Sequence, residues 1–245
     1  MRIAALYDIH GNAPALEAVL AEVEDADVDC VVVGGDVLLG PLPGETLALL
    51  EARADVRWIR GNTDRHVLEP GAGGDLWGAR ARWVHDELTA EERDRIAAWP
   101  ETLVLEVDVV GPTLFCHGSP RSDEEIVTRA TPEGRLREIL ADVADHVVVL
   151  GHTHVQFDRT LDEWRVVNAG SVGMPYEGAT GAYWVVLGPE VDLRRTGYDL
   201  EAAAARIRAS GYPDADAHAA EYVLASTDPD EATTHFERQA SRRTS

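Results

Sequence analysis

Short apolar runs bounded by glycine or turn residues recur along the chain. They are rich in β-branched side chains, which is typical of buried strands. The runs are Ile3–Tyr7, Cys30–Val33, Val56–Ile59, Leu114–Cys116 and His146–Leu150. We therefore expect a fold built on buried β-sheet.

Helical periodicity follows the first two of these runs. Asn12 can cap a helix with Pro14 in its first turn, and apolar residues then repeat at helical spacing. These residues are Leu16, Val19, Leu20 and Val23. A second helix is expected through Thr46–Leu50, so the first 65 residues alternate as βαβαβ. This alternation predicts a parallel sheet.

The middle of the chain changes from helix to strand. Asp75–Trp99 is expected to be helical, with Thr89 and Glu92 at capping-box spacing and Pro100 ending the segment. Strands then dominate from Glu101 to Cys116, and a helix opens near Thr131. Further strands are expected at His146, Val155, Trp164 and Tyr183. The prediction is an α/β fold, a four-layer α/β/β/α sandwich of mixed sheets.

The pattern changes again after Thr196. Ala- and Asp-rich helices are expected at Asp199–Ala209 and Asp214–Leu224, whereas the stretch from Ser226 is polar and has no periodicity. We expect a main domain over residues 1–196 and a C-terminal helical appendix over residues 197–245. The last fifteen or so residues are expected to be frayed.

Composition narrows the function classes. The 245 residues carry a formal net charge of −22, which disfavours non-specific binding to nucleic acid or to anionic membranes. All 22 basic residues are arginine, which excludes a lysine Schiff base and the lysine of a P-loop. No apolar run approaches the length of a signal peptide or a membrane span, so we expect a cytoplasmic protein.

Asp, His and Asn residues stand where the apolar runs end. They are Asp8, His10, Asp36, Asn62, His117, His152 and His154. Open α/β sheets bind ligands beyond the carboxyl ends of their strands, and these side chains suit a catalytic metal centre. A dinuclear centre needs a bridging carboxylate, with the two metals about 3.5–4 Å apart.

The order Asp-x-His, Gly-Asp, Gly-Asn, His-Gly, Gly-His-x-His resembles the calcineurin-like metallophosphoesterase superfamily, over about residues 1–187. The resemblance implies that Asp8, His10 and His154 hold one metal and that Asp36 bridges. It implies that Asn62, His117 and His152 hold the second metal. It also implies phosphoester hydrolysis by a metal-bridging hydroxide, with Asp36, Asn62 and His152 as catalytic residues.

One departure refines this expectation. Many larger members of the superfamily have a histidine after the asparagine ligand, whereas this chain has Thr63, which cannot act as a general acid near neutral pH. The departure resembles the small bacterial phosphodiesterase branch and favours a phosphodiesterase that prefers good leaving groups. The alternatives are a broad phosphomonoesterase or nucleotide pyrophosphatase, or a non-catalytic metal-binding scaffold like the retromer subunit of the superfamily.

Three residues are candidates for contact with the substrate, a small phosphoester. Asn12 could touch the phosphate region or only cap its helix, and Arg121 could grip the phosphate as Arg60 or Arg65 could. Ser171 belongs to the segment Asn168–Gly173, which resembles an Asn-Pro-Gly-Ser segment of the superfamily and could equally be a plain turn.

The metal and the supporting residues are also open at this point. The donors suit Mn, Fe, Zn, Co or Ni, of which we expect Mn. Asp64 is expected either to orient a metal ligand through a hydrogen bond or to cap the following short helix. The sequence leaves homo-oligomer formation open.

Overall fold

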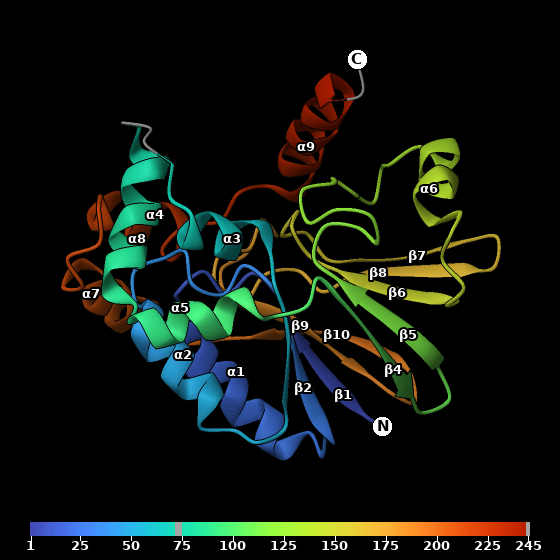
Figure 1. Ribbon diagram of the computed structural model, residues 1–245, viewed down its shortest axis with the longest axis horizontal. Helices are drawn as coiled ribbons and strands as arrows, with labels where there is room; N and C mark the ends of the chain where they lie inside the picture. Colours follow the sequence, from blue (N-terminus) through green and yellow to red (C-terminus); the bar gives the residue numbers. More distant parts are fainter. Residues whose placement is uncertain (72–74, 244–245) are drawn as a thin grey trace.

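Two five-stranded sheets face each other, and helices cover their outer faces (Figure 1). The computed structural model describes residues 1–71 and 75–243 of the chain. Both sheets contain parallel and antiparallel pairs. The predicted four-layer α/β/β/α sandwich of mixed sheets is confirmed.

The first sheet contains the predicted βαβαβ unit. Its strand order is β10-β9-β1-β2-β3, in which β1 (Ile3–Leu6), β2 (Cys30–Gly34) and β3 (Val56–Ile59) are parallel. Helices α1 (Ala13–Asp25) and α2 (Pro43–Glu51) connect them. Strands β9 (Ala182–Leu187) and β10 (Val191–Thr196) complete the sheet on the antiparallel side. The apolar pattern does not predict β10, because only one of the six residues of this edge strand is buried.

The second sheet has the strand order β4-β5-β6-β8-β7. Strand β4 (Thr102–Val107) pairs with β5 (Gly111–Cys116), which runs parallel to β6 (Val147–Leu150). Strands β7 (Phe157–Leu161) and β8 (Trp164–Asn168) form the other edge, and α6 (Glu133–Leu140) packs on the outer face.

Alternate side chains of β1 pack on opposite faces of the first sheet. Ile3, Ala5 and Tyr7 belong to the core between the two sheets, where Tyr7 donates a hydrogen bond to the Val149 carbonyl at 3.1 Å. Ala4 and Leu6 pack instead among the residues of the helical layer. A strand buried on both faces is apolar at nearly every position, which explains why β1 is visible in the sequence as an uninterrupted run.

The segment expected to be helical between Asp75 and Trp99 forms two helices, α4 (Leu76–Glu87) and α5 (Ala90–Ala97), after the short helix α3 (Asn62–Leu68). The capping box between them is confirmed, because Glu92 accepts the Thr89 N–H at 2.7 Å and Thr89 Oγ1 accepts the Glu92 N–H at 3.2 Å. No helix in the described part of the chain is long and apolar enough to cross a membrane.

The C-terminal end differs from its expectation. Helices α7 (Leu200–Arg208) and α8 (Ala215–Tyr222) lie within the predicted ranges, but the expected frayed tail is a third helix, α9 (Pro229–Arg243). Asp228 accepts the N–H groups of the first turn of α9, and Glu237 accepts two hydroxyl hydrogen bonds from the distant loop that contains Thr128. Contacts between segments so far apart in the sequence produce no local hydrophobic periodicity, so the pattern does not predict this helix. Residues 244 and 245 lie outside the described residues.

Candidate metal centre

The seven predicted ligands converge at the carboxyl ends of the central strands. They form two groups in which one donor atom of each residue lies within 4.8 Å of the others. One group is Asp8, His10 and His154, and the other is Asp36, His117 and His152. Asn62 joins the second group, because its Oδ1 lies 3.1 Å from His117 Nε2. The structure therefore brings together all seven residues.

Left-handed backbone turns aim these side chains at one another. Five of the seven residues have φ between 47° and 65°, namely Asp8, His10, Asp36, His152 and His154. Residues other than glycine rarely adopt this backbone conformation, and it persists only where the surrounding structure imposes it. Here the Asp8 N–H donates to the Gly35 carbonyl at 3.1 Å, and the His10 N–H donates to the Asp36 carbonyl at 2.9 Å. The strain is concentrated where the chain leaves its strands toward the site.

The imidazole rings are oriented by backbone carbonyls. Nδ1 of His10, His117 and His154 lies 3.1, 2.9 and 2.7 Å from a carbonyl oxygen. A carbonyl only accepts, so each Nδ1 carries a proton, and each ring in its neutral form presents the lone pair of Nε2 to the site. This tautomer is the one that ligates metals through Nε2.

Several of these acceptor atoms face each other without a hydrogen to share. His10 Nε2 and His154 Nε2 are 3.3 Å apart, and His154 Nε2 also lies 3.1 Å from the buried Oδ1 of Asp8. Buried acceptors in this arrangement repel each other unless a proton or a cation lies between them. The donor set therefore fits divalent metal ions.

The two sides of Asp36 face different groups. Its Oδ1 lies 3.3 Å from His117 Nε2, and its Oδ2 lies 3.8 Å from His10 Nε2. Burial raises the pKa of the Asp36 carboxyl, but the charge and hydrogen bond of His117 outweigh burial, so this pKa lies below its usual range. Asp36 is thus a carboxylate placed between the two groups.

The histidines of the second group are unlike each other electrostatically. Burial lowers the pKa of His117, but the carboxylates of Asp36 and Asp8 raise it to about 10. Burial and the neighbouring His117 lower the pKa of His152 to about 4. A proton on His117 thus balances the neighbouring carboxylates, a role that a bound cation would take over.

Asp64 fixes the turn that carries Asp36. Its buried carboxylate accepts the N–H of Asp36 at 2.9 Å, that of Val37 at 2.9 Å and that of Gly61 at 3.0 Å. The Gly61 bond holds the start of α3, so Asp64 has both of the roles considered for it, orienting a ligand and capping a helix. A Cβ at Gly61 would lie 2.2 Å from Asp36 Oδ1, so only glycine fits there.

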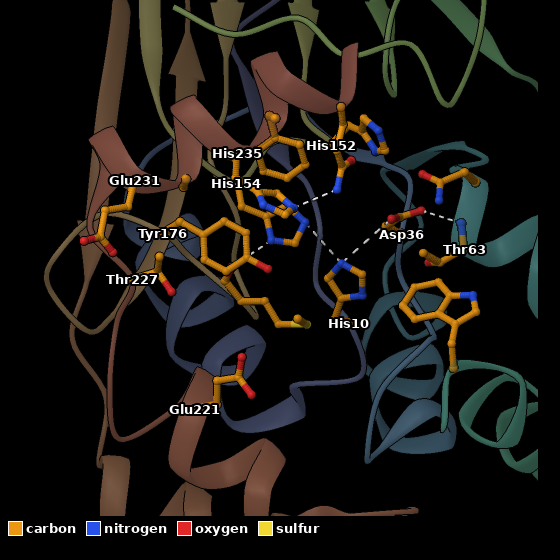
Figure 2. A pocket seen from close by; sticks show the side chains of 16 residues that line it. His10, Asp36, Thr63, His152, His154, Tyr176, Glu221, Thr227, Glu231 and His235 are labelled. Atoms are coloured by element: carbon orange, nitrogen blue, oxygen red, sulfur yellow. Dashed lines mark hydrogen bonds and ion pairs between the residues drawn. The ribbon is translucent and has the colours of Figure 1, made fainter. Parts of the chain in front are cut away.

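A cavity of about 650 Å³ opens above the cluster. Figure 2 shows Asp36 and Thr63 on one side of His10 and His154, and Tyr176, Thr227 and Glu231 on the other. The lining residues are His10, Asp36, Asn62, Thr63, Trp77, His152, His154, Met174, Tyr176, Glu221, Thr227, Glu231, Ala232, His235, Phe236 and Gln239. Helix α9 contributes five of them, from Glu231 to Gln239.

None of the three predicted substrate contacts lines this cavity. Asn12 accepts the Ala15 N–H and donates to the Gly173 carbonyl, so it acts as a helix cap and loop brace. Ser171 is buried, and its hydroxyl donates to the Asp8 carbonyl at 2.7 Å. Arg121 lines a different cavity, where its Nε donates to Glu125 at 3.1 Å. Ser171 therefore supports the Asp8 turn, and Arg121 lies away from the cluster.

Most of the cavity wall could not be recognised from sequence patterns. Tyr176 stacks on the His154 ring with centroids 4.9 Å apart, and the Phe236 centroid lies 6.3 Å from that of His152. Trp77 falls in the helical segment between Asp75 and Trp99, but no local motif marks Tyr176 or Phe236. The sequence alone does not show whether an isolated aromatic residue in a loop or a polar helix lines a cavity or lies on the outer surface.

Comparison with known proteins identifies the family of this chain. The family model for the calcineurin-like phosphoesterase superfamily domain matches residues 1–188. An uncharacterized protein of Methanocaldococcus jannaschii, MJ0912, is 25% identical over 237 residues, which cover 86% of this chain and 94% of that protein.

Two solved structures share the fold at nearly full length. The hypothetical protein PH1004 from Pyrococcus horikoshii OT3 has a TM-score of 0.79 at 20% identity, covering 92% of this chain and 99% of its own. The metallophosphoesterase from Sphaerobacter thermophilus has a TM-score of 0.74 at 24% identity, covering 91% and 99%. With the family model spanning the residues that build the cluster, this chain belongs to the calcineurin-like phosphoesterase superfamily, and its general activity is metal-dependent hydrolysis of a phosphoester.

Proposed function

We propose that the protein is a phosphodiesterase that uses two divalent metal ions. The observation that carries this proposal is the placement of Asp36, whose two carboxylate oxygens face the two donor groups at the floor of an open cavity. A carboxylate in that position suits a bridging ligand. Asp8, His10 and His154 would hold one ion, and Asn62, His117 and His152 the other.

When bound, the ions would supply an activated water nucleophile and neutralise the charge on the phosphoryl oxygens. The protein keeps the ligand atoms in place through the carbonyl-bound Nδ1 atoms and through Asp64. Five of the seven proposed ligands line the cavity, namely His10, Asp36, Asn62, His152 and His154. Of these, Asp36, Asn62 and His152 would lie beside the reacting phosphoryl group.

Thr63 supports a diester over a monoester. It lines the cavity, and its buried Oγ1 has no hydrogen-bond partner among the described residues, so it can donate a hydrogen bond to a phosphoryl oxygen. A hydroxyl does not protonate a leaving group near neutral pH. Diesters with good leaving groups make the smallest demand for such an acid. Among the metals that suit oxygen and imidazole donors, we propose Mn.

The test compares bis-p-nitrophenyl phosphate with p-nitrophenyl phosphate, using metal-stripped protein with and without added Mn²⁺. Asp36→Asn removes the bridging carboxylate, and the exposed Asp142→Asn serves as a charge-matched control. We expect Mn²⁺-dependent turnover that favours the diester and is lost in Asp36→Asn but not in the control. Preference for the monoester would indicate a phosphatase. Metal binding without turnover of either ester would contradict the proposal and favour a scaffold.

A further inference from the structure

The wall of the cavity combines aromatic rings with carboxylates. Tyr176, Phe236 and Trp77 supply rings, and Glu221 and Glu231 supply acids. Trp77 is 46% exposed, which is high for so large an apolar residue. The cavity volume of about 650 Å³ is in the range of pockets that enclose a whole organic molecule. The site therefore has room and apolar surface well beyond what a phosphate group needs.

The aromatic wall begins at the metal ligands themselves. Tyr176 stacks on His154 with an interplanar angle of 19°, and Phe236 lies 6.4 Å from Tyr176 between centroids. Phe236 also lies near the ring of His152. A flat group in contact with these rings would therefore lie beside two of the proposed metal ligands, His152 and His154.

The charges of the cavity wall disfavour a substrate that carries a second phosphate group. Although the chain has 22 basic residues, no arginine lines the cavity in the described part of the chain. Nucleotide polyphosphates need cationic side chains along their phosphates. Here Glu231 and Glu221 would repel a second anionic group, whereas Thr227 and Gln239 can form hydrogen bonds with neutral polar edges.

Resting on the proposed phosphodiesterase activity, we propose that the substrates are nucleoside phosphodiesters with a single negative charge, whose base stacks on the aromatic wall formed by Tyr176 and Phe236. A base has a flat ring for the aromatic wall and polar edges for Thr227 and Gln239. Nucleoside polyphosphates are poor substrates in this assignment.

The experiment uses two esters with the same leaving group and the same charge, thymidine 5′-p-nitrophenyl phosphate and methyl p-nitrophenyl phosphate, on metal-loaded protein. Stacking of a base on an aromatic side chain corresponds to a factor of about ten or more. We expect kcat/KM to be at least about tenfold higher for the thymidine ester, mainly through KM. Phe236→Ala should reduce this preference several-fold, measured as the ratio of kcat/KM for the two esters in the same variant, whereas Phe236→Tyr keeps an aromatic ring and should retain most of it.

A third ester tests the charge of the wall. Thymidine 3′-phosphate 5′-p-nitrophenyl phosphate keeps the base and the leaving group and adds a phosphate. We expect a higher KM than for the thymidine ester, and Glu231→Arg should bring the two KM values closer. A lower KM for the 3′-phosphate ester in the unaltered protein would overturn the inference.

The outcomes separate this inference from the proposed function. Equal kcat/KM for the methyl and thymidine esters would overturn the inference and leave the phosphodiesterase activity intact. Turnover of neither ester with any added metal would instead overturn the phosphodiesterase activity. Equal losses on both esters in Phe236→Ala would show that this ring supports the metal centre rather than the base, which also overturns the inference.

Discussion

The carboxylate of Asp64 accepts the backbone N–H of Asp36 at 2.9 Å, so one buried acid positions the turn that carries another. Asp64→Ala would leave four N–H groups without this acceptor, and we expect a loss of about 3 kcal/mol in the free energy of unfolding, together with weaker metal binding. Urea unfolding and metal content measure the two effects. Asp199→Ala removes a single exposed helix cap and should cost only about 1 kcal/mol. Equal losses in both variants would contradict the role of Asp64.

Metal binding should stabilise the fold. The lone pairs of His10 and His154 face each other in the chain without metal, and a cation between them removes this repulsion. Ligand at about 100 times its Kd adds about 2.7 kcal/mol of stability, which for a chain of this length corresponds to a rise in Tm of about 5–10 °C. Calorimetry of stripped protein with and without Mn²⁺ measures the rise. It should largely disappear in His154→Ala and persist in His66→Ala, and an unchanged rise in His154→Ala would argue against this site.

The rate should depend steeply on the leaving group. Because Thr63 cannot protonate a departing alkoxide near neutral pH, we expect aryl phosphodiesters to be hydrolysed at least about a hundredfold faster than alkyl phosphodiesters. Steady-state rates over a series of leaving groups of increasing pKa measure this dependence. A flat series would mean that another group supplies the proton. His235 would then be the first to replace, since it is an imidazole that lines the cavity and stands apart from the seven ligand positions.

The first third of the chain could be predicted well because its signals are local. Strands such as β1 are buried on both faces and therefore apolar at every position. The residues of the cluster directly follow those strands, so His10 and Asp36 are placed as soon as the strands are recognised. Parallel strands then bring separate motifs to one edge of the sheet without further information.

The cavity wall and the C-terminal helix could not be predicted, because they depend on contacts between distant segments. α9 is polar along most of its length, and it packs through small residues such as Ala232 and Ala240. Arg121 looked like a phosphate ligand from its place after His117, but Glu125 on the same loop binds its guanidinium. Sequence patterns identify charged residues, but not which of the available partners each one chooses.

Glu237 should hold α9 against the domain. Its Oε1 accepts the hydroxyl hydrogen bonds of Thr128 at 2.6 Å and Thr131 at 2.8 Å. In Glu237→Ala we expect amide hydrogen exchange in α9 to speed up about tenfold, since a local loss of 1.4 kcal/mol corresponds to a factor of ten. The exposed Arg238→Ala in the same helix should leave exchange unchanged. Equal exchange rates in α9 of the unaltered protein and of Glu237→Ala would show that the two hydrogen bonds do not anchor the helix.

His218 should make stability depend on pH. Its ring is 2% exposed on α8, packs against Tyr212 and Tyr222, and has no hydrogen-bond partner among the described residues for either nitrogen. Burial, aided by the charge of Arg80, lowers its pKa to about 3 from the usual 6.5. The unfolded chain therefore binds a proton at this residue below pH 6.5 while the folded chain does not, so stability is fully present above pH 6.5 and is lost as the pH falls toward 3. Between pH 8 and pH 5 this residue alone should lower the free energy of unfolding by about 2 kcal/mol.

Urea unfolding at both pH values, in the unaltered protein and in His218→Phe, measures the difference, because phenylalanine keeps the ring packing and cannot bind the proton. The variant should lose about 2 kcal/mol less than the unaltered protein over this range, and equal losses would show that the folded state accepts the proton at His218.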